Sequence, residues 1–125
     1  MITIPGHLDG LNEYTRATRA NLYAGAAMKR NNEAKVKEAI AEALENAEAR
    51  PVNADDYPLC VCITWYDDTS RDLDNIIFAK KFIFDALSAM GIIKDDSIKY
   101  ISAVHERVER EKKKPRIEVK FEKIV

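Results

Sequence analysis

The sequence predicts a single α+β domain, a two-layer sandwich in which two helices cover one face of a small mixed sheet. The chain has 125 residues, of which 46% are hydrophobic and 33% charged, as in one ordinary globular domain. Apolar side chains recur at helical spacing in two segments and show strand-like patterns in four others. The segments follow in the order strand, loop, helix, strand, helix, strand, strand. Helices packed on one face of a sheet would bury these apolar faces.

The first half of the chain is expected to hold a strand, a loop and a helix. Residues 1–5 are short and strand-like, and residues 6–29 fit no regular period, which predicts a long and functional loop. Asn31 or Asn32 is a suitable N-cap for a helix that reaches about Ala49. The apolar stripe of this helix comprises Val36, Ile40, Ala43, Leu44 and Ala47.

The second half is expected to hold three strands around a helix. Residues 59–66 are apolar on both faces, which is typical of a central strand. The second helix begins at Leu73 or Asp74 and ends at Met90, with Gly91 as a natural residue just past its end. The last two strands are predicted at residues 98–108 and 116–124, joined by a charged hairpin turn.

Four carboxylates bracket the second predicted helix. Asp72 and Asp74 stand at its start, and Asp95 and Asp96 follow Gly91. Either pair alone is also typical of a helix cap or a solvated turn. Together they offer the oxygen ligands that Mg²⁺ prefers, with positions left for water and phosphate. A helix of about seventeen residues is roughly 25 Å long, so the pairs meet only if the chain doubles back after Gly91. We expect this return, and with it metal-assisted phosphodiester chemistry.

Basic and amide side chains near these acids are candidates for contact with DNA. On a helical wheel Lys81 shares the face of Asp74, whereas Lys80 lies about 100° away. The basic segments could hold phosphates, but a solvated loop and a turn that discourages edge pairing are equally ordinary explanations. The predicted DNA-binding residues are Asn12, Arg16, Arg19, Lys29, Arg30, Arg71, Lys112, Lys113 and Lys114.

Several classes of protein and site are disfavoured. The sequence has neither an apolar run of eighteen residues nor a signal-like start, so we expect a cytoplasmic protein with no membrane partner. It has no Walker-type glycine loop, which argues against a nucleotide cofactor. Cys60 and Cys62 are too close in a strand for an unstrained disulfide and are interpreted as small apolar side chains on one face. His7 and His105 are assigned no chemistry.

The acidic segments resemble a known nuclease family. Arg71-Asp72-Leu73-Asp74-Asn75, Lys81, Phe84-Asp85-Ala86-Leu87, Gly91 and Asp95-Asp96 are similar to the RusA family of Holliday junction resolvases, which are mostly phage or prophage endodeoxyribonucleases. The resemblance is strongest over residues 70–100. It implies a RusA-like fold and a homodimer that cuts four-way DNA junctions by paired, symmetric cleavage with Mg²⁺ or Mn²⁺.

The resemblance also implies roles for individual residues. Asp72, Asp74 and Asp96 would be the essential acids, Asp95 an additional acid beside the metal, and Lys81 the active-site lysine. Three extra residues between Asp74 and Lys81 depart from the family spacing and leave Lys80 as an alternative. Two further hypotheses stay open: a module that binds branched DNA without cutting it, and a sheet edge that binds another protein.

Overall fold

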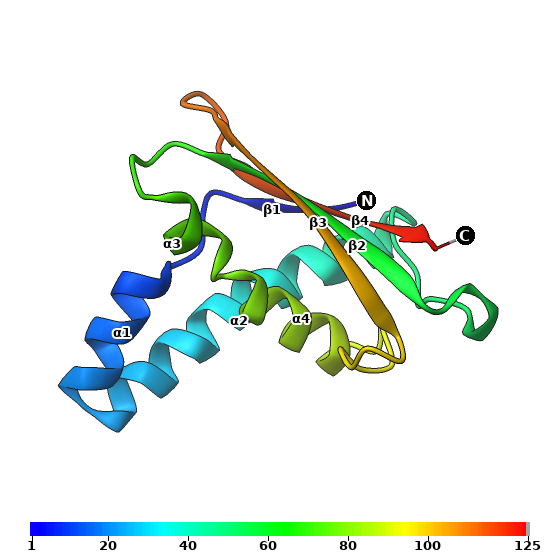
Figure 1. Cartoon of the computed structure of the whole chain (residues 1–125), viewed down its shortest axis with the longest axis horizontal. Helices are drawn as coiled ribbons and strands as arrows, with labels where there is room; N and C mark the ends of the chain where they lie inside the picture. Colours follow the sequence, from blue (N-terminus) through cyan, green and yellow to red (C-terminus); the bar gives the residue numbers. More distant parts are fainter. Residues whose placement is uncertain (125) are drawn as a thin grey trace.

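The computed structural model describes residues 1–124 and confirms the α+β class (Figure 1). One mixed sheet has the strand order β1-β4-β2-β3, with the helices on one of its faces. Strand β2 pairs parallel with β3 and antiparallel with β4, while β1 pairs antiparallel with β4. The strands are β1 (Ile2–Pro5), β2 (Leu59–Asp67), β3 (Ile101–Arg110) and β4 (Arg116–Lys123).

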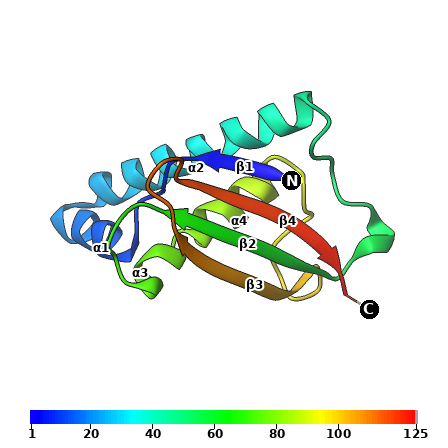
Figure 2. The same ribbon diagram turned by 90° about the horizontal axis from the view of Figure 1, so that it is seen from above.

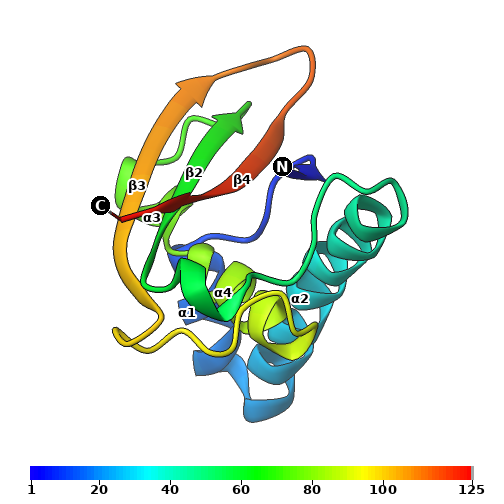
Figure 3. The ribbon, with the colours of Figure 1, turned by 90° about the vertical axis from the view of Figure 1, so that its right-hand side faces the viewer.

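The second layer consists of one helix of 24 residues and shorter helices of ten residues or fewer. The helices are α1 (Leu11–Ala20), α2 (Leu22–Glu45), α3 (Leu73–Ile77) and α4 (Lys80–Ala89), with a short 3-10 turn at Ala54–Asp56. Alternate residues of β2 face the helices and are buried, whereas the others lie on the face that the helices leave open (Figure 3). The core contains Ile2, Ile4, Val36, Ile40, Val61, Ile63, Trp65, Phe82, Ile83 and Leu87. Burial of these side chains is the main favourable term in folding.

The prediction of a long loop at residues 6–29 is wrong. Helix α1 occupies residues 11–20, and α2 begins at Leu22, about ten residues before the predicted start. Periodicity missed α1 because none of its residues is fully buried. The α1–α2 hairpin instead packs closely at Gly25, where a Cβ would lie 2.6 Å from the Thr18 Cγ2 atom. This hairpin extends past the end of the sheet (Figure 2).

Asn32 is not a helix cap but a buried residue inside α2. Its Oδ1 atom accepts a hydrogen bond from the Asp9 backbone nitrogen at 2.9 Å. Its Nδ2 atom donates to the Asp9 carboxylate and to the Met28 carbonyl, both at 2.8 Å. Asn32 therefore fastens the segment after β1 to the long helix.

The second predicted helix is broken into α3 and α4. At the break, the Ala79 backbone nitrogen donates to the Ile76 carbonyl at 3.3 Å, and the Lys81 backbone nitrogen donates to the Phe78 carbonyl at 3.2 Å. Such bonds between residues three apart form a tighter turn than an α-helix. One helical wheel therefore does not relate Asp74 to Lys81. The predicted end at Gly91 is confirmed: this residue has φ +72°, and the Ile92 nitrogen donates to the Leu87 carbonyl at 3.0 Å.

The last two strands do not form the predicted hairpin, because β2 lies between β3 and β4. The connection at residues 111–115 instead crosses the end of β2, where the Glu111 nitrogen donates to the Asp67 carbonyl at 2.9 Å. The parallel β2–α4–β3 crossover places β3 on the outside of the sheet. A parallel pair needs such a long connection, because a short turn cannot join its two strands.

Two further expectations concern the cysteines and the membrane. Cys60 and Cys62 are free thiols on the open face of β2 with sulfur atoms 3.8 Å apart, as interpreted from the sequence. Burial and the neighbouring Cys60 raise the pKa of the Cys62 thiol to about 11. Across residues 1–124, no helix combines the length and apolar character needed to cross a bilayer.

Replacing Asn32 with alanine is expected to lower the free energy of unfolding by about 2 kcal/mol, because buried polar groups of the Asp9 segment and Met28 lose their partner. Urea denaturation followed by circular dichroism measures this. Asn31→Ala is the matched control, since Asn31 is exposed on the same helix. Equal losses in the two variants would contradict the proposed anchoring role.

Candidate functional site

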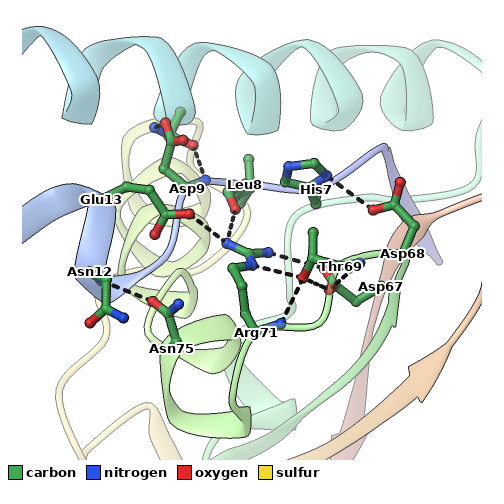
Figure 4. A network of polar contacts seen from close by, with 11 residues as sticks. His7, Leu8, Asp9, Asn12, Glu13, Asp67, Asp68, Thr69, Arg71 and Asn75 are labelled. Carbon is green, nitrogen blue, oxygen red and sulfur yellow. Dashed lines mark hydrogen bonds and ion pairs between the residues drawn. The ribbon is translucent and has the colours of Figure 1, made fainter.

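The carboxyl end of β2 carries a buried aspartate, Asp67, which is 4% exposed. Its Oδ2 atom accepts hydrogen bonds from the Thr69 hydroxyl and, at 3.0 Å, from the Thr69 backbone nitrogen. Its Oδ1 atom accepts from the Arg71 guanidinium at 3.0 Å (Figure 4). These hydrogen bonds fix the conformation of the turn after β2.

Arg71 joins three parts of the chain through one buried guanidinium group. Besides Asp67, it donates to the Leu8 carbonyl at 3.1 Å, to Thr69 at 2.9 Å and to Glu13 of α1 at 3.4 Å. Its side chain is only 13% exposed. The Arg71 side chain points into the protein, where it holds these segments together. Its predicted contact with DNA gains no support from this position.

Two opposing effects act on the pKa of Asp67. Burial alone raises the pKa, because it disfavours the charged form. The hydrogen bonds from Thr69 and the charge of Arg71 outweigh burial and hold the pKa below its ordinary value. The carboxylate is therefore ionised in the folded protein and stabilises the guanidinium beside it.

Three exposed acids project from the segment that Arg71 holds: Asp68, Asp72 and Asp74, here called the acidic turn. Asp72 precedes α3 and Asp74 lies in its first turn. Asn75 ties α3 to α1, since its Oδ1 atom accepts from the Asn12 backbone nitrogen at 2.9 Å. Hydrogen bonds thus hold this segment against α1, the chain after β1 and the end of β2.

The second acidic pair, Asp95 and Asp96, is also exposed and is here called the distal acids. Their loop is fastened to the beginning of β2: Lys94 donates to the Tyr57 hydroxyl at 3.0 Å, and Leu59 donates to the Tyr100 carbonyl at 2.8 Å. Asp95 accepts from the Ser97 nitrogen at 2.7 Å, and the hydrogen bonds from Ser97 lower its pKa.

The two acidic pairs do not meet within one chain, which corrects the expectation of a return after Gly91. Leu59 pairs with Ile101 and Asp67 with Arg110, so β2 and β3 run side by side between the two pairs (Figure 1). The eight steps of β2 span about 26 Å at the usual rise of a strand. The chain returns toward the acidic turn only along β3, which begins after the distal acids. The distal acids therefore stay near the start of β2. Within residues 1–124, no three His, Cys, Asp or Glu side chains gather as metal ligands.

The two candidate lysines differ in their surroundings. The Lys80 ammonium lies 3.1 Å from the Glu106 carboxylate of β3, which gives this side chain a structural partner. Lys81 is half exposed, and its ammonium lies 3.9 Å from Asp85. Lys81 is therefore the more available of the two at the start of α4.

The predicted DNA-binding residues are mostly exposed. Asn12, Arg16 and Arg19 follow one another by four and three positions on α1 and share a face. Arg30 is exposed on α2, whereas Lys29 lies 3.6 Å from Asp85. The connection that crosses the end of β2 near Asp67 carries the exposed side chains of Lys112, Lys113 and Lys114.

Sequence reasoning overlooked the residues that hold the acidic turn. Asp67, Glu13 and Asn75 were given no role, and neither was the contact of His7 Nδ1 with the Asp68 carboxylate at 3.4 Å. An available signal was the pair of aspartates that directly follows an apolar strand. Glu13 and Asn75 carry no such signal, because their partners are far away in sequence.

The chain matches no protein-family model, and no curated protein matches it. A surface hollow of about 400 Å³ lies between residues 48–53 and strands β1, β2 and β4, and none of the predicted acids lines it. The candidate functional groups are therefore the two acidic groups and the exposed basic side chains.

Asp67→Asn is expected to lower the free energy of unfolding at pH 7 by about 2 kcal/mol, because it removes charge-assisted hydrogen bonds. The folded-state pKa is depressed, so this contribution is present above the unfolded pKa of about 3.9 and is lost as the pH falls through the folded value. Denaturant unfolding at several pH values measures both effects. The exposed Asp55, changed to asparagine, is the control. A difference from wild type that stays constant down to pH 2 would contradict this assignment.

Proposed function

We propose that this protein is a divalent-metal-dependent endonuclease that cuts four-way DNA junctions. The observation that carries the proposal is the acidic turn. Asp72 and Asp74 are exposed there, on a segment that the ion pairs of Arg71 hold in place. The residues around it are those in which the sequence resembles RusA-family resolvases. Exposed basic side chains lie on either side of it, on α1 and on the connection after β3.

The exposed carboxylates fit a hard metal ion. Across residues 1–124, no lysine, arginine or histidine forms an ion pair with Asp72, Asp74, Asp95 or Asp96. Asp74 and Asp95 each accept one hydrogen bond from a backbone nitrogen through Oδ1, which leaves their Oδ2 atoms available. Few carboxylates with open positions are what Mg²⁺ takes in proteins. Bound there, Mg²⁺ or Mn²⁺ would lower the pKa of a water and neutralise charge on the phosphate.

The protein side chains would do the binding and positioning. Asp72 and Asp74 would hold the ion, while the Arg71 network keeps their backbone fixed. Lys81 would offset charge near the scissile phosphate. Asn12, Arg16 and Arg19 on one side, and the three lysines after β3 on the other, would hold two DNA arms through their phosphates. A twofold dimer would present two such sites to the two symmetric strands of a junction.

A second candidate function is a module that binds branched DNA without cutting it. One observation favours it: the two acidic pairs lie at opposite ends of β2 in a single chain. In that case the basic side chains alone would carry the function. Binding would then be indifferent to divalent metal, and changes of acid to amide would leave function intact.

Asp74→Asn is expected to abolish cleavage of a synthetic four-way junction in Mg²⁺, with a loss of at least about 100-fold, because the metal loses a charged ligand. The assay compares junction with linear duplex, in Mg²⁺ and in EDTA. Asp55→Asn, an exposed acid away from the turn, should keep wild-type activity. Full cleavage by Asp74→Asn would sink the nuclease proposal, and tight binding without any wild-type cleavage would favour the binding module.

Replacing Lys112, Lys113 and Lys114 with alanine should weaken junction binding and flatten its dependence on salt. If all three contact phosphates, the slope of log K against log salt should fall by about 2 to 3. Fluorescence anisotropy in EDTA measures binding without cleavage. The control replaces Lys35, Lys120 and Lys123, which are equally exposed elsewhere. An unchanged slope in the first variant would remove this connection from the DNA interface.

A further inference from the structure

Two thiols lie next to each other on the face of the sheet that the helices leave open (Figure 3). Cys60 and Cys62 are the only cysteines of the chain, and both are free and partly exposed. Cysteine is among the residues most often found fully buried in proteins. Packing in the core does not explain these two thiols, because the core lies on the other face of β2.

The surroundings of the two thiols are polar. On β4, Glu122 lies opposite Cys60. Lys120 on β4 and His105 on β3 lie opposite Cys62, and all three of these neighbours are exposed. Burial, the neighbouring Cys60 and then Glu122 raise the pKa of the Cys62 thiol, so the Glu122 carboxylate lies near this sulfur. Groups that bind cations thus adjoin the sulfurs.

We propose that Cys60 and Cys62 together chelate a thiophilic divalent cation such as Zn²⁺ on the open face of β2. This site is separate from the acidic turn and does not rest on the proposed function, because carboxylates select Mg²⁺ whereas thiolates select softer ions. Binding replaces two S–H bonds with two metal–sulfur bonds and releases two protons to the solvent. No atom changes its oxidation state.

The spacing of the two sulfurs carries the proposal. The sulfur atoms lie 3.8 Å apart. A disulfide bond is about 2.05 Å long, so these sulfurs are not bonded to each other. Two sulfurs that bind one tetrahedral Zn²⁺ at about 2.3 Å lie roughly 3.8 Å from each other. Because alternate side chains of a strand point to the same face, β2 itself holds both sulfurs at the spacing that one ion requires.

Two sulfurs fill half of a tetrahedral coordination sphere, and water can take the rest. The Glu122 carboxylate is the candidate for a third protein ligand. It lies 3.6 Å from the Lys120 ammonium in an exposed ion pair, and such pairs contribute little stability. Within residues 1–124, no three potential ligands already surround one point, so Glu122 would have to turn toward the sulfurs. The two thiols are the part of the site that the fold provides.

Titration of the reduced wild-type chain with Cd²⁺ is the first test, because cadmium–thiolate bonds absorb in the ultraviolet. One Cd²⁺ should bind per chain, and Zn²⁺ should compete with it. Cys60→Ser and Cys62→Ser should each lower the affinity at least about 100-fold, more than a change beside the ligands usually does. Thr64→Ser, on the same face of β2, is the matched control and should bind as the wild type does. Binding that survives either cysteine change would overturn the proposal.

The second test needs no variant. N-ethylmaleimide should modify both cysteines of the folded wild-type chain, and an equimolar amount of Cd²⁺ should protect both, as mass spectrometry measures. Thiols that the reagent cannot reach without Cd²⁺, or that Cd²⁺ does not protect, would overturn the proposal. Sedimentation equilibrium should show the same mass with and without Cd²⁺. An increase in mass would place the ion between thiols of different chains and overturn the site within one chain.

A third measurement separates this site from the acidic turn. The double variant Asp72→Asn and Asp74→Asn should bind Cd²⁺ as the wild type does, and an excess of Mg²⁺ should not displace the ion. Loss of Cd²⁺ binding in this variant, or displacement by Mg²⁺, would assign the ion to the carboxylates and overturn the thiol site.

Discussion

The buried Arg71 guanidinium is the interaction on which the candidate site depends. It bonds to the end of β2 through Asp67, to the segment after β1 through Leu8, and to α1 through Glu13. A buried charge is tolerated only when it is paired and hydrogen-bonded, and removing one partner costs more than the pair contributes. This network therefore holds the exposed acids of the turn by constraining the backbone beneath them.

The parallel crossover from β2 through α4 to β3 has two consequences. It separates the acidic turn from the distal acids by the length of a strand, and it places β3 at the edge of the sheet, where no further strand within residues 1–124 pairs with it.

The nuclease and binding-module proposals share one surface and differ in what the carboxylates do. The basic side chains of α1 and of the connection after β3 would hold phosphates in either case. Only in the nuclease would the acids gather around an ion, and only a site with enough carboxylates could hold it. The two proposals therefore differ in whether Asp72 and Asp74 hold a divalent metal ion.

Sequence patterns were enough to predict the fold class, the four strands and the end of the helix at Gly91, because alternation, helical period and capping are local signals. Only the tertiary contacts make most of residues 11–29 helical, since α1 meets the core through Tyr14, which packs on Phe78 and Phe82, and none of its residues is fully buried. The tertiary structure also decided that Arg71 is buried and that the acidic pairs lie apart. These depend on strand order and on partners distant in sequence, such as Glu13 and Asn75, which no local pattern encodes.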